Sequence, residues 1–539
     1  MATKSQIMSR YPNDKVVSVK DFGAVGDGVT DDTAAIVSAL AGGGTIMADG
    51  LYALSGATLL SLTGLNYFNI ISGTRLISTP STEFRITANQ LADGTRFEIT
   101  GNNVVIENGT FKEVNGTLGR HNFYGTLSGV GASNVSINDV TVDGSNGAGM
   151  HFRINCTNFS IKRPRILNTK ADGLQIQRGG SQFSIVSPYI TATEDDCIGI
   201  VGHGRNEGYD RPSDVEILGG YLGAQANGAV GSGLAVVGAT DVRAIGVKCE
   251  SNGLSNIRIT DFTDAGEGNY ATSNVLLESP QCFNGGLTVS GLGGLVKDGI
   301  TIANSRDIRV VNADVRNPTK NGVTVSNASI DVDITNLKVR EATVRGLWVA
   351  ATSMTASHVL ELANDYGDGR YSSATSLKCE YLSLRGVDIQ RSGDDGFYID
   401  GATTGDVVNP TFSNIYVDLS NVNNTAGKYG IFLSDTTGLE LSGANGGTSA
   451  SGTAVTSLVF VNADYNRITG IESNYPSTTY PLRTRGTKRE FYNGAIPSGA
   501  PTVGYPYELG EIIWNTNPAS GTVFWICTAT GGAGTWVAK

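Results

Sequence analysis

Four acidic residues stand where the sequence turns into short apolar strands. The segment TEDDCIGI (193–200) places Glu194, Asp195 and Asp196 directly before such a strand, and Asp172 precedes the strand of ADGLQI. Neighbouring carboxylates cannot all ionise comfortably, so one of them is expected to hold a proton at neutral pH. A protonated acid beside an ionised one is what cleavage of a glycosidic bond requires. This pattern predicts a hydrolytic site.

A repeat brings these acids together. A polar residue, a glycine or other small residue and an alternating apolar strand recur along the chain, and the steps from 172 to 196, 298 to 321 and 321 to 345 are 24, 23 and 24 residues. The repeats begin at Asp172, Asp196, Ser232, Asp298, Asn321, Arg345 and Asp395. A period of this length, made of strands and turns, predicts an all-β solenoid with three strands per turn, a parallel β-helix. Residues one period apart would then stack roughly 4.8 Å apart.

An ordinary turn is the alternative interpretation of the acids. Asp or Asn followed by Gly is common turn chemistry, and Asp298, Asn321 and Asp395 occupy the same position without other signs of a site. Catalysis is favoured for Asp172 and the 195–196 pair because no insertion separates their repeats. The doublet Asp394–Asp395 is a second-choice site, since an arginine stands one repeat earlier.

Composition agrees with the β-helix and limits the partners. Glycine makes up 71 of 539 residues and charged residues 17%, which suits short strands joined by tight turns. The net charge is −11 with no basic tract, so nucleic acid is not an expected partner, although a groove lined by its own Arg and Lys could bind an anionic polymer. No apolar run approaches the roughly 20 residues of a spanning helix, so membrane insertion is not expected.

The cysteines and histidines predict neither a metal site nor a cofactor. Their spacing is not that of metal ligands, and we expect the cysteines to be buried free thiols in a protein that folds in a reducing cytoplasm. These residues are Cys156, Cys197, Cys249, Cys282, Cys379, Cys527, His121, His151, His203 and His358.

Five segments are expected along the chain. They are an N-terminal arm or truncated linker (1–15), an N-terminal cap (16–65), the catalytic β-helix (66–440), boundary strands (441–490) and a small C-terminal β domain for trimerisation or carbohydrate binding (491–539). The cap contains a short helix in TDDTAAIVSALAGGG, with Thr30 or Asp31 as its N-cap, that covers the open end of the solenoid. The aromatic residues of the last segment form either the core of that domain or a surface that stacks on sugar. They are Trp514, Phe524, Trp525 and Trp536.

Two stretches resemble known families. VVSVKDFGAVGDGVTDDTAAI (16–36) resembles the opening of the pectate-lyase-like right-handed β-helix of bacteriophage tailspikes and related polysaccharide-degrading proteins. NTKADGLQI followed by TEDDCIGI is similar to the polygalacturonase motifs Asn-Thr-Asp and, one coil later, Asp-Asp-Cys. The resemblance implies that Asp172, Asp195 and Asp196 form the acid and base group of an inverting hydrolase.

The chain departs from the polygalacturonase pattern. Ser232 stands where that family has the His of Gly-His-Gly, and a Gly-His-Gly containing His203 occurs earlier instead. Lys170 and Ala171 interrupt the first motif, and Arg258 is followed by Ile-Thr instead of Ile-Lys. The same machinery is therefore expected to act on a sugar other than galacturonate. The expected substrate-binding residues are His203, Arg258, Arg205 and Ser232.

The resemblance implies a phage tailspike depolymerase that hydrolyses bacterial capsular polysaccharide or O-antigen. Such a protein would be a homotrimer on the virion tail, joined to the tail or baseplate by a region missing from this sequence, and made in the host cytoplasm. A neighbouring subunit could add acids to the site. Those acids would be Glu361, Asp365 and Asp368.

Two alternatives remain open. The first is a polysaccharide lyase that acts by β-elimination on a uronate-containing capsule, with Tyr209, Arg205 or His203 as its base. The second is an adhesin that binds glycan without cleaving it.

Overall fold

The computed structural model describes two compact units. Unit 1 contains Met1–Gln281 and Leu287–Leu295, and unit 2 contains Cys282–Gly286 and Val296–Lys539. The structure describes residues 16–55, 58–59, 63, 67–86, 95–114, 125–225, 231–264, 268–285, 298–326, 329–351, 379–390, 395–401, 407–418, 429–434, 436–445, 456–461, 465–472, 491–492, 512–514, 524–529 and 535–538.

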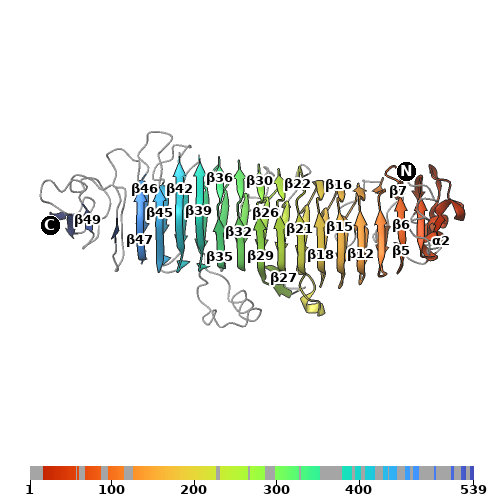
Figure 1. The fold of residues 1–539 in the computed structure, drawn as a ribbon, viewed down its shortest axis with the longest axis horizontal. Helices are drawn as coiled ribbons and strands as arrows, with labels where there is room; N and C mark the ends of the chain where they lie inside the picture. Colours follow the sequence, from red (N-terminus) through yellow and green to blue (C-terminus); the bar gives the residue numbers. More distant parts are fainter. Residues whose placement is uncertain are drawn as a thin grey trace. The chain divides into compact units, whose positions relative to one another are not determined.

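Unit 1 is a parallel β-helix with three strands per coil, as the repeat predicts (Figure 1). One coil contains β17 (Leu174–Gln177), β18 (Ser181–Val186) and β19 (Tyr189–Thr193). The next coil begins with β20 (Ile198–Val201), and Leu174 pairs with Ile198, 24 residues further on. Apolar side chains of each strand alternate inward, so every coil adds a layer to one continuous core.

Three parallel sheets follow from this winding. Sheet 1 contains β5 (Tyr67–Ile70), β8 (Arg96–Ile99), β11 (Gly125–Val130), β14 (Ala148–Arg153), β17, β20, β23 (Leu234–Val237) and β26 (Ile257–Thr260). Sheet 2 contains β1 (Val16–Ser18), β3 (Thr45–Ala48), β6 (Arg75–Ser78), β9 (Val104–Glu107), β12 (Ser133–Asn138), β15 (Thr157–Lys162), β18, β21 (Ser213–Leu218), β24 (Thr240–Ile245) and β29 (Thr272–Glu278). Sheet 3 contains β2 (Asp27–Asp31), β4 (Leu51–Leu54), β7 (Glu83–Ile86), β10 (Thr110–Glu113), β13 (Thr141–Asp143), β16 (Arg165–Thr169), β19, β22 (Tyr221–Gly223) and β25 (Lys248–Glu250).

Aromatic side chains stack in the core of unit 1. The rings of Phe159 and Phe183, on neighbouring strands of sheet 2, are stacked with their centroids 4.9 Å apart. Phe152 of sheet 1 meets both rings at 4.7 and 5.5 Å. All three are almost fully buried, and such pairs contribute beyond the area that they bury.

The helix of the cap is α2 (Thr33–Ala41), which contacts η1 (Val19–Phe22) and β5 and ends at Gly42. The predicted N-cap is wrong by one or two residues, because the N-cap is Asp32. The Asp32 carboxylate is turned away from the helix and accepts the N–H groups of Val25 and Gly26. Asp31 instead accepts the first helical N–H, from Thr33.

Unit 2 continues the same architecture. One of its sheets contains β31 (Ile300–Ala303), β34 (Val323–Ser326), β37 (Leu347–Ala351), β40 (Phe397–Gly401), β43 (Tyr429–Ser434) and β46 (Thr456–Val461). The other strands of its coils are β32 (Ser305–Val311), β33 (Asp314–Arg316), β35 (Ile330–Thr335), β36 (Lys338–Arg340), β38 (Cys379–Glu380), β39 (Ser383–Gln390), β41 (Val407–Val408), β42 (Thr411–Asp418), β44 (Thr436–Thr437), β45 (Leu439–Asn445), β47 (Tyr465–Glu472) and β48 (Phe491–Tyr492). Parallel pairing thus extends beyond residue 440, where the sequence repeat fades.

The last strands differ from the coils. β49 (Ile512–Trp514), β50 (Phe524–Ala529) and β51 (Thr535–Ala538) form an antiparallel sheet. The side chains of its aromatic residues lie outside the described part, so their role stays a prediction. Two short elements remain in unit 1, the hairpin of β27 (Phe262–Asp264) and β28 (Gly268–Tyr270) and the 3₁₀ helix η2 (Arg205–Glu207).

Four cysteines are buried free thiols, as predicted: Cys156, Cys197, Cys249 and Cys282. The side chains of Cys379 and Cys527 lie outside the described residues. Among the described residues, no helix has the length and apolar character that crossing a membrane needs.

The glycine that follows most polar residues of the repeat is required by close packing. A Cβ on Gly173 would lie 2.3 Å from Cγ2 of Ile190 and 2.6 Å from the carbonyl oxygen of Cys197. A Cβ on Gly322 would lie 2.2 Å from Cγ1 of Val339 and 2.4 Å from the carbonyl oxygen of Gly346. The repeat therefore has glycine here because the chain touches both a neighbouring strand and the next coil.

Replacing Gly322 with alanine is expected to lower the free energy of unfolding by about 1–3 kcal/mol, because the added methyl group overpacks the turn. Denaturant unfolding of the purified variant measures this. Gly42→Ala is the control, since its Cβ would make only an ordinary contact of 3.6 Å with the Ala39 carbonyl oxygen. Equal stability of the two variants would contradict the packing explanation.

Candidate active site

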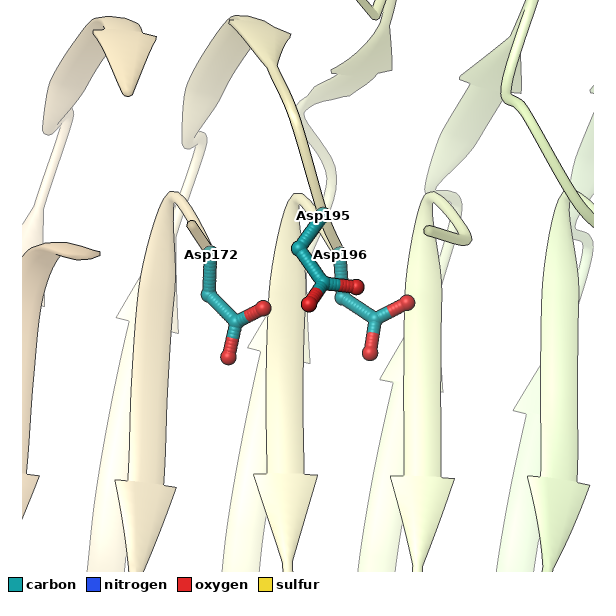
Figure 2. A group of neighbouring side chains, drawn as sticks. All are labelled: Asp172, Asp195 and Asp196. Carbon is teal, nitrogen blue, oxygen red and sulfur yellow. The ribbon is translucent and has the colours of Figure 1, made fainter. Parts of the chain in front are cut away.

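The three predicted aspartates lie together at one corner of unit 1. Asp172 precedes β17, and Asp195 and Asp196 precede β20, at the same turn of consecutive coils (Figure 2). One carboxylate oxygen from each lies within 4.8 Å of those of the other two. Asp172 and Asp196 are each 5% exposed, whereas Asp195 is half-buried.

Backbone hydrogen bonds between the coils set this arrangement. The Gly173 N–H donates to the Asp196 carbonyl oxygen at 2.8 Å, which aligns the two turns. Each turn is closed by a threonine hydroxyl: Thr169 donates to the Ala171 carbonyl oxygen and Thr193 to that of Asp195, at 2.9 and 2.7 Å. The acids are therefore presented by a repeated and rigid turn.

Gln225 fixes the acidic turn from the following coil, although no sequence pattern pointed to it. Its buried amide donates to the carbonyl oxygens of Asp195 at 2.6 Å and Ser232 at 3.1 Å. Its own oxygen accepts the Gly253 N–H at 2.6 Å. A lone glutamine in a turn has no distinctive spacing, so only the structure identifies this role.

The carboxylate of Asp196 has two partners from later coils. One oxygen accepts the Ser232 N–H at 2.6 Å, and the other lies 3.5 Å from the guanidinium of Arg258. Asp172 lies over Gly199, where a Cβ would come within 3.0 Å of its Oδ2. The glycine thus leaves the space that the Asp172 carboxylate occupies on the outer face of sheet 1.

Cys197 lies directly beneath the acids. Burial raises the pKa of its thiol to about 12, and the charges of Asp196 and Asp172 act in the same direction. The thiol therefore stays protonated and is unsuited to act as a nucleophile.

Not every predicted residue joins the aspartates. Arg258 reaches Asp196, and its role in substrate binding stays a prediction. Ser232 meets Asp196 through its backbone N–H, while its buried hydroxyl has no hydrogen-bond partner among the described residues. Glu194 is exposed and is not part of the carboxylate group.

His203 and Arg205 are not at the acidic corner. They follow the opposite end of β20, more than about 15 Å along the extended strand from Asp196 at roughly 3.3 Å per residue. The His203 ring packs edge-on against Phe262, and Arg205 lies over the ring of Tyr270. The early Gly-His-Gly therefore forms a separate surface.

The second-choice site lacks the features of the first. Asp395 is 1% exposed, and its Oδ2 lies 3.3 Å from Nε of Arg345, so its charge is balanced within the fold. Asp394 lies outside the described residues. So do the loop acids Glu361, Asp365 and Asp368.

Asp298 shows what the repeated aspartate does without a site. It is fully buried, and Oδ1 accepts the N–H of Asn321 in the next coil at 3.1 Å, as Asp196 accepts that of Ser232. Burial raises the pKa of Asp298 to about 6. The aspartate of the repeat therefore has a structural function, which is to join its turn to the next coil. At Asp196 the same position also has two further carboxylates, those of Asp172 and Asp195, and the guanidinium of Arg258 beside it.

Three carboxylates this close have the chemistry of a site for Ca²⁺ or another hard cation. The Arg258 guanidinium already places a positive charge beside Asp196, which weakens the case for a metal. Because these two observations point in opposite directions, the expectation that the protein works without a metal stays a prediction.

Comparisons with known proteins agree with this fold. Residues 16–266 match the family described as "Rhamnogalacturonase A/epimerase, pectate lyase-like". No curated protein matches the sequence. Similar solved structures include bacteriophage phi29 gene product 12 in its pre-mature form, with 17% identity, a TM-score of 0.51 and coverage of 92% of this chain and 60% of that chain.

Two carbohydrate enzymes also match. The A-module of Azotobacter vinelandii mannuronan C-5 epimerase AlgE6 has 15% identity and a TM-score of 0.43, with 85% of this chain and 100% of that chain covered. The catalytic unit of an α-1,3-glucanase from Streptomyces thermodiastaticus has 16% identity and a TM-score of 0.39, with 62% and 65% covered. Over residues 16–266, the family match indicates a pectate-lyase-like β-helix fold, which is associated with carbohydrate-active enzymes.

Asp298→Asn is expected to change the pH dependence of stability. The folded state holds the Asp298 proton up to about pH 6, whereas the unfolded chain releases it near the ordinary aspartate pKa of 3.8. The contribution of this group to the free energy of unfolding therefore declines as pH rises from about 4 to about 6, by roughly 3 kcal/mol. Asparagine keeps the oxygen that accepts the Asn321 N–H and removes that decline.

Denaturant unfolding at pH 4, 5, 6 and 7 measures the difference between the variant and the parent protein. The free energy of unfolding of Asp298→Asn, relative to that of the parent protein, should increase as pH rises. A constant difference would contradict the raised pKa.

Proposed function

We propose that this protein is a glycoside hydrolase that cleaves a bacterial surface polysaccharide. The observation that carries the proposal is the group of three aspartates, with oxygens within 4.8 Å of one another, on the outer face of a pectate-lyase-like β-helix. Glycosidases use paired carboxyl groups in this way, one to protonate the leaving oxygen and one to activate water or attack the sugar.

The surroundings support a division of roles. A guanidinium at one oxygen of Asp196 and a backbone N–H at the other suit this residue to carry the negative charge. Asp195 is the most exposed of the three and is proposed to protonate the glycosidic oxygen. Asp172 is packed over Gly199. We propose that the proton and the negative charge of the group are distributed among Asp172, Asp195 and Asp196.

Two arguments give opposite stereochemical outcomes. The polygalacturonase resemblance implies inversion, whereas the observed spacing is nearer to the carboxyl separation of about 5–5.5 Å in retaining enzymes than to the roughly 6.5–9.5 Å of inverting ones. We propose inversion, because three carboxylates can position a water molecule without a wide gap between any two of them.

The biological setting of the proposal rests on the resemblance of residues 16–36 to the opening of tailspike β-helices. We propose a homotrimeric tailspike on a virion tail, whose partner is capsular polysaccharide or O-antigen. Elimination would need a base beside the acids. The residues suggested for that role come after the opposite end of β20: His203, Arg205 and Tyr209. The acidic corner therefore favours hydrolysis over elimination.

Asp172→Asn, Asp195→Asn and Asp196→Asn are each expected to reduce chain cleavage at least about 100-fold, because each removes a carboxylate from acid–base catalysis. Purified capsules from a bacterial panel serve as substrates, and size-exclusion chromatography measures their chain length. Asp298→Asn is the matched control, since it makes the same change at the same repeat position away from the acids. Glu194→Gln controls for loss of a nearby exposed charge.

Near-normal cleavage by all three site variants would place the chemistry elsewhere. A wild-type protein that binds the capsules but leaves their chain length unchanged would support the adhesin alternative.

The products are expected to show hydrolysis with inversion and without a metal. No new ultraviolet absorbance should appear, the first product observed by proton NMR should have the inverted anomeric configuration, and EDTA should leave the rate unchanged. Absorbance from a new double bond would instead indicate the lyase, and loss of activity in EDTA that Ca²⁺ restores would indicate a metal at the acids.

A further inference from the structure

We infer that Asn252 is a positioning residue for Asp195 and Asp196, which it holds in place from two coils further along the chain. This inference rests on the proposed function and adds to it a residue that orients the reacting acids without taking part in the chemistry. Two segments carry the argument. They are called the acidic turn, residues 193–196, and the supporting turn, residues 251–256.

Asn252 is buried inside unit 1. It is 0% exposed, so a substrate in solvent does not reach it. Ile198 pairs with Leu234, and Leu234 pairs with Ile257, which places the supporting turn two coils after the acidic turn. Any effect of Asn252 on the acids must therefore pass through the residues that it contacts.

The side-chain amide of Asn252 joins three coils. Its oxygen accepts the S–H of Cys197, with the sulfur 3.8 Å away. Its nitrogen donates to the Leu222 carbonyl oxygen at 3.4 Å and to Oδ1 of Asn256 at 2.8 Å. Because Cys197 directly follows Asp196, the first of these contacts reaches the end of the acidic turn.

A second route runs through the coil between the two turns. The Gly253 N–H donates to Oε1 of Gln225 at 2.6 Å, and Nε2 of Gln225 donates to the Asp195 carbonyl oxygen at 2.6 Å. Gln225 makes both bonds only while its amide keeps one orientation. Since a thiol is a weaker donor than an amide, this route is the stronger of the two.

The backbone of the acids packs tightly against the intermediate coil. A Cβ on Gly231 would lie 2.0 Å from the carbonyl carbon of Asp195 and 2.2 Å from the backbone nitrogen of Asp196. The Gly231 carbonyl oxygen in turn accepts the Leu254 N–H at 2.8 Å. The supporting turn therefore also sets the place of the glycine on which the acids rest.

The supporting turn leads into the strand that carries Arg258. The Asn256 carbonyl oxygen accepts the Leu234 N–H at 3.0 Å, which aligns the start of β26 with β23. Arg258 follows two residues later and lies 3.5 Å from Oδ2 of Asp196. Because Asn252 is bonded to the Asn256 side chain, its loss should disturb both the acids and their arginine.

Asn252→Ala is expected to lower kcat about tenfold or more on a capsule that the parent protein cleaves, because a misplacement of about 1 Å can cost this much. KM should stay within about twofold of the parent value, since a buried group that orients the acids does not bind substrate. Steady-state kinetics measures both. If the alanine variant does not fold, Asn252→Ser takes its place. Its hydroxyl keeps part of the hydrogen bonding, so its effects should be smaller and in the same direction.

Asn321→Ala is the matched control for loss of a buried amide. Asn321 is also 0% exposed, and its Nδ2 donates to the Thr324 hydroxyl at 3.1 Å in unit 2. This variant should lower the thermal unfolding midpoint, as Asn252→Ala does, and leave kcat unchanged.

A double variant tests whether Asn252 acts through Gln225. Gln225→Ala alone should lower kcat. Adding Asn252→Ala should lower it by less than the product of the two single effects, because both changes release the same turn. A loss equal to that product would show that the two residues act independently and would contradict the second route.

Alkylation of Cys197 by N-ethylmaleimide tests the hold on the acidic turn without any substrate. Cys197 is 0% exposed and should be protected in the parent protein, as should the equally buried Cys282 of unit 2. Asn252→Ala should speed labelling of Cys197 about tenfold or more relative to Cys282, because the turn above it opens more often. Peptide mass spectrometry measures the rates, and Asn321→Ala should leave the rate at Cys197 unchanged.

Three results would each overturn the inference: parent kcat in Asn252→Ala, an equal loss of kcat in Asn321→Ala, or unchanged labelling of Cys197. The proposed function fails separately. If the parent protein cleaves no capsule, hydrolysis falls, and the labelling of Cys197 alone decides whether Asn252 holds the acidic turn.

Discussion

The hydrogen bond from the Gly173 N–H to the Asp196 carbonyl oxygen represents the constraint on which the structure depends. Backbone hydrogen bonds between parallel strands hold each coil at the distance of one strand from the next coil. Residues 24 positions apart, such as Leu174 and Ile198, therefore become neighbours. Without that register, Asp172 and Asp196 would be unrelated acids in a long chain. With it, their turns align and their side chains emerge on the same face.

The polar residue of the repeat serves the fold first. Asp298 and Asp196 both accept a backbone N–H from the next coil, and the glycine that follows most of the repeat positions, such as Gly173 and Gly322, lets the turn pack against its neighbour. At the candidate site a second acid stands beside the repeated one and Arg258 faces it. The candidate site is therefore a local elaboration of a structural position that recurs in both units.

The repeat and the acids were readable in the sequence because both depend on local spacing. The three-strand coils and the meeting of Asp172 with Asp195 follow from one period. The N-cap was misplaced because the Asp32 side chain accepts the N–H groups of Val25 and Gly26, in the preceding segment, instead of an N–H of its own helix. Gln225 was not predicted, since it joins residues from different coils whose side-chain directions no local pattern specifies.

Two insertions, one after a strand of sheet 1 and one after a strand of sheet 3, lengthen the chain between strands, while the three acids belong to the regular coils. The segment from Gly202 to Pro212 follows β20 and contains His203, and the turn that holds Gln225 follows β22. Insertions at these points lengthen the path between strands but leave strand pairing unchanged, as the alignment of Ile198 with Leu234 shows. A protein built this way can change the loops between its strands while the coils that hold the three aspartates keep their register.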